Sequence, residues 1–76
     1  MLRGPPMKIN NNVQPVRKSL HLTQESLAKQ IGVSRRTIVS IEKGNYTPSL
    51  MLAFQLAQAL KIPLTDLFTI NEENQT

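Results

Sequence analysis

The sequence contains no cysteine, which excludes a disulfide scaffold and a cysteine-ligated zinc site. It has one histidine, His21, and no acidic cluster stands near it in the sequence, so we expect no bound metal. A nucleophile–base pair, a carboxylate pair and a phosphate-binding glycine loop are absent as well. We therefore predict neither a cofactor nor an enzymatic activity.

Long hydrophobic runs are also missing. The most apolar stretch, Leu50–Leu60, is interrupted by Gln55 and Gln58 and falls short of the ~20 residues that a bilayer span needs. The first residues include proline and asparagine where a signal peptide would have an apolar segment. These features predict a cytoplasmic protein with no membrane partner.

The size and charge of the chain narrow the function further. With 76 residues it is expected to form one small domain, whose core cannot support a deep catalytic cleft. The formal net charge is +4, and residues 1–43 contain eight Lys or Arg against two acids. Residues 44–76 contain one Lys and three acids. A basic front half suits binding of a polyanion, although many small domains are similarly basic.

The first and last residues of the sequence show no helical or strand periodicity. Residues 1–11 contain glycine, two prolines and asparagines, which predicts a flexible leader. Met7 is a candidate natural start, with residues 1–6 left over from expression. We expect a folded domain over residues 12–70 and a frayed polar tail over residues 71–76.

The first three helices are predicted by their caps and apolar spacing. One runs from Val13 to about Leu20, with Asn12 as its cap. A second covers residues 24–31 after Thr23, although Ser26, where Glu is common, weakens its capping box. Gly32 ends it, and Ser34 begins a third helix over residues 34–43. Two helices joined by a short glycine-containing turn are typical of a helix-turn-helix, here residues 24–43.

Two more helices and no strand are expected in the rest of the chain. Thr47 can cap a fourth helix that begins at Pro48 and ends at Leu60, and this helix is apolar over more than half its circumference. Pro63 can start a short fifth helix. The predicted fold class is therefore all-α, with five short helices.

The third helix has two different faces. A helical wheel places Ile38 and Ile41 toward the core, with Arg36, Val39, Ser40 and Lys43 opposite and Arg35 and Thr37 on the flanks. The two arginines lie in the first helical turn, where the helix dipole disfavours cations. Arginine pairs with guanine, and an exposed β-branched valine suits a thymine methyl group. The alternative is an ordinary solvated face.

The segment "LTQESLAKQIGVSRRTIVSIEKGNYTPSLMLAFQLAQALKIPLTDLF" resembles the Cro/repressor-type (XRE-family) helix-turn-helix domain. The resemblance covers roughly residues 13–68, about three quarters of the chain. It implies a five-helix, lambda-repressor-like DNA-binding domain whose third helix enters the major groove. It also implies that Arg17 and Glu42 form an internal ion pair joining the first and third helices.

The resemblance and the wheel together suggest roles for individual residues. Arg35, Arg36 and Ser40 are expected to read bases, while Ser34, Thr37 and Gln24 approach the DNA backbone. Lys43, Asn45 and Tyr46 should approach phosphates; their alternatives are a helix-end cation, a turn residue and a ring packed on the domain. The complete predicted DNA-binding set is Gln24, Ser34, Arg35, Arg36, Thr37, Val39, Ser40, Lys43, Asn45 and Tyr46.

These features predict a sequence-specific transcriptional regulator, a repressor acting as a homodimer on a palindromic operator in double-stranded DNA of a prokaryotic nucleoid. The apolar excess of the fourth helix, with Leu64 to Ile70, is the candidate dimer contact. Alternatively, these residues only complete the monomer core. A second hypothesis is an antitoxin-like or other protein-interaction module that binds a protein partner as well as DNA.

Overall fold

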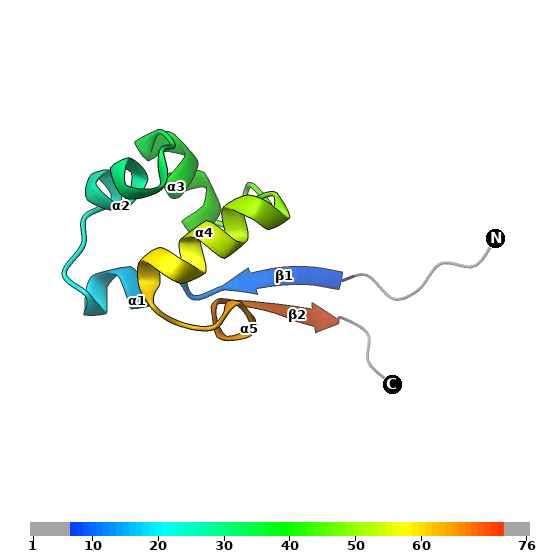
Figure 1. Ribbon diagram of the computed structural model, residues 1–76. Coiled ribbons are helices and arrows are strands. Elements are labelled where there is room, and N and C mark those ends of the chain that lie inside the picture. Colours follow the sequence, from blue (N-terminus) through cyan, green and yellow to red (C-terminus); the bar gives the residue numbers. More distant parts are fainter. Residues whose placement is uncertain (1–6, 73–76) are drawn as a thin grey trace.

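The computed structural model describes residues 7–72 and shows five helices and a two-stranded sheet (Figure 1). The elements in chain order are β1 Met7–Asn11, α1 Val13–Ser19, α2 Gln24–Ile31, α3 Arg35–Glu42, α4 Leu50–Leu60, α5 Leu64–Leu67 and β2 Phe68–Glu72. The five predicted helices are therefore present. The all-α prediction is incomplete, because the structure adds a small two-stranded sheet to the five helices.

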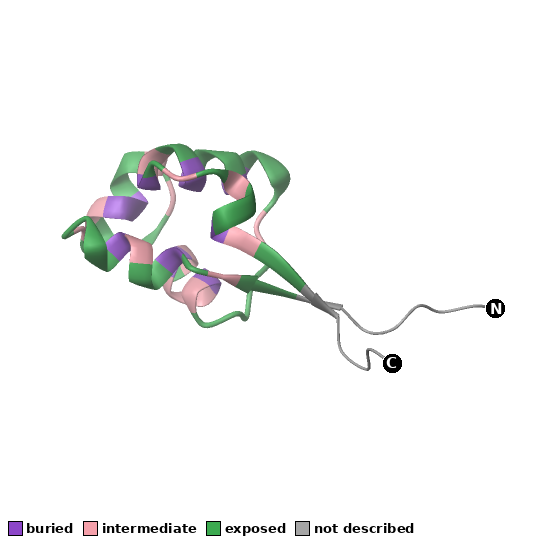
Figure 2. Cartoon of the chain, turned by 90° about the horizontal axis from the view of Figure 1, so that it is seen from below, coloured by how far each residue is buried: buried purple, intermediate pink, exposed green. Residues whose placement is uncertain are grey.

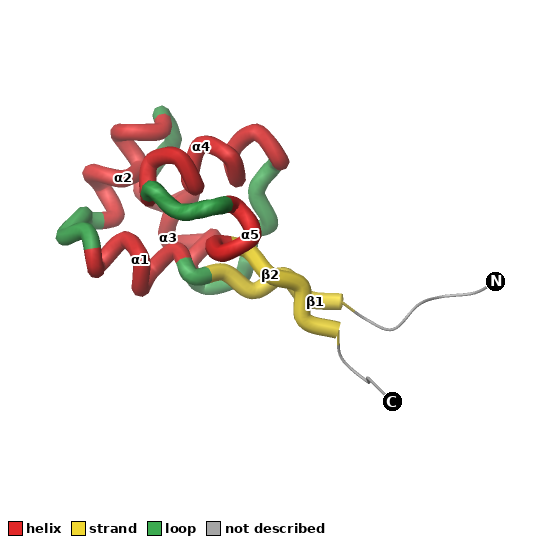
Figure 3. Tube along the Cα trace, turned by 60° about the horizontal axis from the view of Figure 1, so that its bottom comes forward, coloured by secondary structure: helices red, strands yellow, loops and turns green. Residues whose placement is uncertain are grey.

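The two strands form an antiparallel ribbon that projects from the helices (Figure 3). Its register places Ile9 opposite Ile70 and Asn11 opposite Phe68. Residues 7–11 are thus not a flexible leader, and the first two residues of the predicted tail, Asn71 and Glu72, belong to β2. Each strand pairs with the backbone groups on the facing edge of the other, which neither could do alone. The expectations for residues 1–6 and 73–76 fall outside the described residues.

The helix starts differ from the predicted caps in two places. Asn12 makes no side-chain cap; instead the Asn11 Oδ1 accepts from the Val13 N–H at 3.0 Å. Helix α4 begins at Leu50 rather than Pro48, because the Ser49 hydroxyl accepts from the Leu52 N–H at 3.1 Å.

The capping box of α2 is complete despite its serine. Thr23 Oγ1 accepts from the Ser26 N–H at 2.9 Å, and Ser26 Oγ accepts from the Thr23 N–H at 3.0 Å. The short hydroxyl side chain therefore performs the reciprocal bond that glutamate usually makes.

Helices α1 to α4 all end in the same way. A residue one or two positions past each helix has a left-handed backbone: His21 (φ 60°), Gly32 (φ 76°), Gly44 (φ 79°) and Lys61 (φ 62°). The N–H groups that follow turn back to carbonyls of the last turn, as in the bonds from Gly44 N to Ile41 O (3.0 Å) and from Asn45 N to Ser40 O (2.9 Å). This pairing satisfies the free carbonyls and bends the chain toward its next helix.

Helix α4 is the centre of the core, and it contacts α1, α2 and α5. Figure 2 shows the buried positions, in purple, along the helical part of the chain. The largest fully buried side chains are Val13, Leu27, Ile38, Ile41, Leu56, Leu60 and Leu67. Leu67 from the short α5 closes this core next to the ribbon.

Within residues 7–72, none of the helices combines the length and apolar character needed to cross a membrane.

Candidate nucleic-acid interface

Helices α2 and α3 form the predicted helix-turn-helix. Gly32 turns the chain after α2, and the Val33 N–H bonds back to Ala28 O at 3.0 Å. Ala28 is 3% exposed, and its small side chain lets the two helices approach closely. Ser34 then begins α3 by accepting from the Thr37 N–H at 3.2 Å. The inner face of α3 packs against the domain and so fixes the orientation of its outer face, as a recognition surface requires.

The structure places Ile38 and Ile41 in the core, in agreement with the helical wheel. On the other side of α3, Arg35 and Arg36 are exposed, and Thr37, Val39 and Ser40 are half-buried. Val39 is therefore less exposed than the wheel suggests. The outer face therefore has two long basic side chains at the start of α3, followed by shorter polar and apolar side chains that are half-buried.

The two arginine side chains are not engaged within the domain. Among the residues whose side chains the structure describes, neither guanidinium makes a hydrogen bond or an ion pair. Both lie in the first turn of α3, which contains no acidic residue. Two cations beside the positive end of a helix dipole do not stabilise that helix. Their hydrogen-bond donors remain available for an external anion or base edge.

Five of the predicted residues meet around one shallow hollow of about 290 Å³ beside α3. Its lining consists of Arg36, Thr37, Ser40, Asn45 and Tyr46. Tyr46 is 46% exposed, so its ring is not packed into the core. The loop after α3 therefore adds polar and aromatic groups to the surface that the helix begins. Gln24, Ser34, Arg35, Val39 and Lys43 do not line this hollow.

The hydroxyl groups at the start of α3 are already paired with each other. Ser34 Oγ and Thr37 Oγ1 lie 3.0 Å apart. This contact fixes both side chains at the N-terminus of the helix, where the free N–H groups favour an anion. It is compatible with the predicted approach to a phosphate.

Behind the recognition face, Arg17 and Glu42 form the ion pair that the resemblance implies. Arg17 Nε donates to Glu42 Oε2 at 2.6 Å, and Arg17 Nη2 donates to Glu42 Oε1 at 3.2 Å. The two side chains are 8% and 3% exposed. Arg17 Nη1 also donates to Leu22 O at 2.8 Å. The pair therefore ties α1 and the chain before α2 to the last residue of α3.

Gln24 belongs to the same network, which the sequence did not indicate. Its Nε2 donates to Glu42 Oε1 at 3.1 Å, and its side chain is half-buried. No local pattern links residues at this separation, so only the packing of α2 on α3 could reveal the contact. The network holds one amide donor of Gln24 inward and restricts how this residue can face DNA.

Known proteins share this fold and much of this sequence. The family model described as Helix-turn-helix (HTH_3) matches residues 16–67. The uncharacterized HTH-type transcriptional regulator MJ0272 from Methanocaldococcus jannaschii is 45% identical over 65 residues, covering 86% of this chain and 98% of that protein. The cryptic phage CTXphi transcriptional repressor RstR, from Vibrio cholerae, is 31% identical over 65 residues, covering 86% of this chain and 59% of that protein.

A solved structure agrees with these sequence matches. The restriction-modification controller protein C.AhdI from Aeromonas hydrophila aligns with a TM-score of 0.70 and 34% identity, covering 74% of this chain and 85% of that one. The family predicted from the sequence is thereby confirmed. The chain belongs to the XRE-type helix-turn-helix family and is a DNA-binding transcriptional regulator, not an enzyme.

Proposed function

We propose that the protein is a sequence-specific repressor that reads the major groove of double-stranded DNA with α3. The observation that carries this proposal is the outer face of α3, where two exposed arginines have no partner among the described side chains. Arginine donors aimed outward from a rigid helix match the O6 and N7 acceptors of guanine. Val39 and Ser40 follow on the same helix, where they would meet neighbouring base edges.

The surrounding residues supply contacts to the DNA backbone in this proposal. Ser34 and Thr37 lie at the N-terminus of α3, and Gln24 lies at the N-terminus of α2. Lys43, Asn45 and Tyr46 follow α3 and are exposed. Contacts of this kind fix the register of a protein on DNA, while the base contacts specify the sequence.

Selection of binding sites from random double-stranded DNA tests this function. We expect enrichment of one short sequence that contains a guanine-bearing half-site, because a bidentate arginine contact discriminates against the wrong base by about 1–3 kcal/mol. A selection that enriches no sequence would contradict sequence-specific reading by α3, even if the protein binds DNA.

The similarity to the repressor RstR supports repression as the regulatory outcome. A small DNA-binding domain can repress simply by occupying DNA that the transcription machinery needs. A reporter gene placed behind the selected sequence is expected to lose expression when the protein is supplied.

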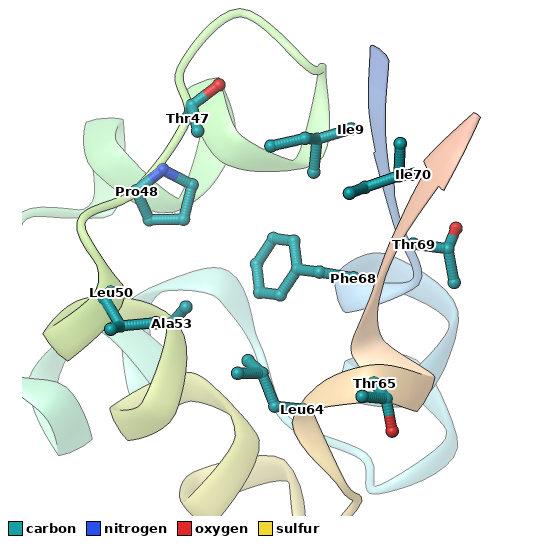
Figure 4. Close-up of a pocket in the computed structure, with 10 residues that line it drawn as sticks. All are labelled: Ile9, Thr47, Pro48, Leu50, Ala53, Leu64, Thr65, Phe68, Thr69 and Ile70. Carbon is teal, nitrogen blue, oxygen red and sulfur yellow. The ribbon is translucent and has the colours of Figure 1, made fainter. Parts of the chain in front are cut away.

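We further propose that two copies bind a palindromic operator. One small domain buries too little DNA surface for high specificity, and two copies would engage half-sites one helical turn apart. An apolar hollow of about 390 Å³ lies between the ribbon and α4, with the Phe68 ring at its centre (Figure 4). Around it, Leu50 is 69% exposed, Ile70 64% and Ile9 47%. We call this surface the ribbon face, defined by Ile9, Leu50, Ala53, Leu64, Phe68 and Ile70.

The ribbon face suits a second copy for two reasons. It is contiguous and apolar, and its lining contains no charged residue. Within residues 7–72 the ribbon has two strands, so each strand also has an outer edge with no partner strand among those residues. Such edges accept further strands or are covered by a partner. A two-fold contact through one face would bury the same patch on both copies.

Leu50→Glu is expected to convert the dimer to a monomer, weakening self-association by about 100-fold or more because a charge would be buried without a partner. Met51→Glu is the matched control: Met51 is 70% exposed on the same helical turn but does not line the ribbon face. Sedimentation or light scattering measures both variants. A wild-type protein that stays monomeric, free and on its DNA, would contradict the homodimer and favour the alternative of another protein partner.

A further inference from the structure

We propose that Asn11 is a positioning residue that sets the orientation of α3 relative to the ribbon, and thereby the distance between the two recognition helices of a dimer. This inference rests on the proposed homodimer. It concerns a residue at the junction of three elements rather than one on the DNA-facing surface.

The side chain of Asn11 connects the ribbon directly to the recognition helix. Asn11 is the last residue of β1 and pairs with Phe68 of β2. Its Nδ2 donates to the backbone carbonyl of Ile41 at 2.9 Å, across 30 residues of sequence. Among the described residues, this is the hydrogen bond that joins the ribbon to α3.

The same amide also fixes the start of α1. Asn11 Oδ1 accepts from the Val13 N–H at 3.0 Å, so both ends of the amide are used and its orientation is defined. With the oxygen committed to α1, the NH₂ group must face Ile41. Asn11 is therefore held by three elements at once: β2 through the strand register, α1 through its oxygen and α3 through its nitrogen.

The chemistry of the α3 end requires a donor at this point. Ile41 lies in the last turn of α3, where carbonyl groups carry the negative end of the helix dipole. Its carbonyl also accepts from the Gly44 N–H at 3.0 Å. The neutral amide donor of Asn11 gives this carbonyl oxygen its second hydrogen bond, whereas the carbonyl oxygen would repel a carboxylate in the same place.

The consequence for DNA binding follows from the position of the ribbon face. In a dimer built on that face, the ribbon forms part of the contact between copies together with α4 and α5. The direct hydrogen-bonded link from the ribbon to the reading helix of each copy is the one from Asn11 to α3. A loosened junction would leave each half-site contact intact. It would allow the distance between the α3 helices of the two copies to vary, and this distance determines the spacing of half-sites.

Asn11→Asp tests this inference because it keeps the acceptor for the Val13 N–H and replaces the donor to Ile41 with a carboxylate oxygen that this carbonyl repels. Asn12→Asp is the matched control: Asn12 Nδ2 donates to Asp66 O at 3.0 Å, and the structure gives it no hydrogen bond to α3. Asn11→Ser is a second variant without added charge, since serine can still cap α1 but is too short to reach Ile41.

The readout is binding to a series of palindromes whose half-sites are moved apart or together by one or two base pairs, and to a single half-site. Wild type and Asn12→Asp should prefer one spacing by about tenfold or more, because mismatched geometry removes the gain from two-site binding. For Asn11→Asp and Asn11→Ser we expect that preference to fall to about threefold or less. Single half-site affinity and dimerisation should stay within about threefold of wild type.

Three results would contradict the proposed role of Asn11. Unchanged spacing preference in both Asn11 variants would overturn the role of Asn11. An equal loss of single half-site affinity would also overturn it, because the residue would then act on the stability of the domain. If the wild-type protein itself shows no spacing preference and no dimer, the proposed homodimer fails and the inference fails with it. If Asn11→Asp does not fold, Asn11→Ser decides by the same criteria.

Discussion

Replacing Glu42 with alanine is expected to lower the free energy of unfolding by about 3–5 kcal/mol, the usual effect of removing one partner of a buried ion pair. Arg17 is 8% exposed in its side chain, and Glu42 accepts three of the hydrogen bonds in its network. Without the carboxylate, a charged guanidinium would remain buried with only the Leu22 carbonyl as partner. For a domain of this size, that loss is a large share of the total stability.

Urea denaturation followed by circular dichroism measures this effect, and we expect the midpoint to fall by about 3 M for a small domain. The control is the double variant Arg17→Met, Glu42→Leu, which removes both charges and keeps apolar volume. It should recover most of the stability, because a buried ion pair contributes little compared with well-packed apolar residues. A Glu42→Ala variant within about 0.5 kcal/mol of wild type would show that solvent reaches Arg17 and that the pair has no structural importance.

Substitution of the two arginines of α3 is expected to have the largest effect on DNA binding. If one of them reads guanine, its change to alanine should weaken the selected sequence by about 5–150-fold and abolish preference at one base pair. If the other contacts a phosphate, its change should weaken all sequences alike and reduce the salt slope by about one. If both arginines read bases, the double variant Arg35→Ala, Arg36→Ala should lose preference at two base pairs. If only one reads a base, the double variant should lose preference at one base pair and bind all sequences more weakly.

Fluorescence anisotropy on the selected sequence and on its single-base variants, at several salt concentrations, separates these outcomes. Lys61→Asn serves as a charge control, because it removes one positive charge at the end of α4 in a residue type that tolerates a left-handed backbone. Both arginine variants should remain folded, since their side chains are exposed. If neither arginine variant differs from the Lys61→Asn control, α3 would not be the reading element.

The helices were predictable because the signals that define them are local. Thr23 and Ser34 cap the helices that they precede, and Gly32 and Gly44 end the helices that they follow. The inner face of α3 also followed from spacing, since Ile38 and Ile41 are both fully buried. Local rules were less reliable where neighbouring residues compete: Asn11 and Ser49 act as caps in place of Asn12 and Thr47.

The ribbon was not predictable, although each strand carries a short alternation of apolar and polar residues. Phe68 and Ile70 alternate with Thr69, and Ile9 stands between polar neighbours. Such short runs become strands only when a partner supplies hydrogen bonds, and here the partners lie at opposite ends of the chain. The same is true of the Gln24 contact to Glu42, which depends on how α2 packs against α3.

The sequence by itself determined the helix-turn-helix, the family and the basic outer face of α3, because caps, turns and helical periodicity act between residues a few positions apart. The tertiary structure alone decided that residues 7–11 and 68–72 pair into a ribbon and that an apolar hollow opens beside α4. It also decided that the Asn11 amide meets the end of α3. These features depend on contacts between residues far apart in the chain, which exist only after the core has formed.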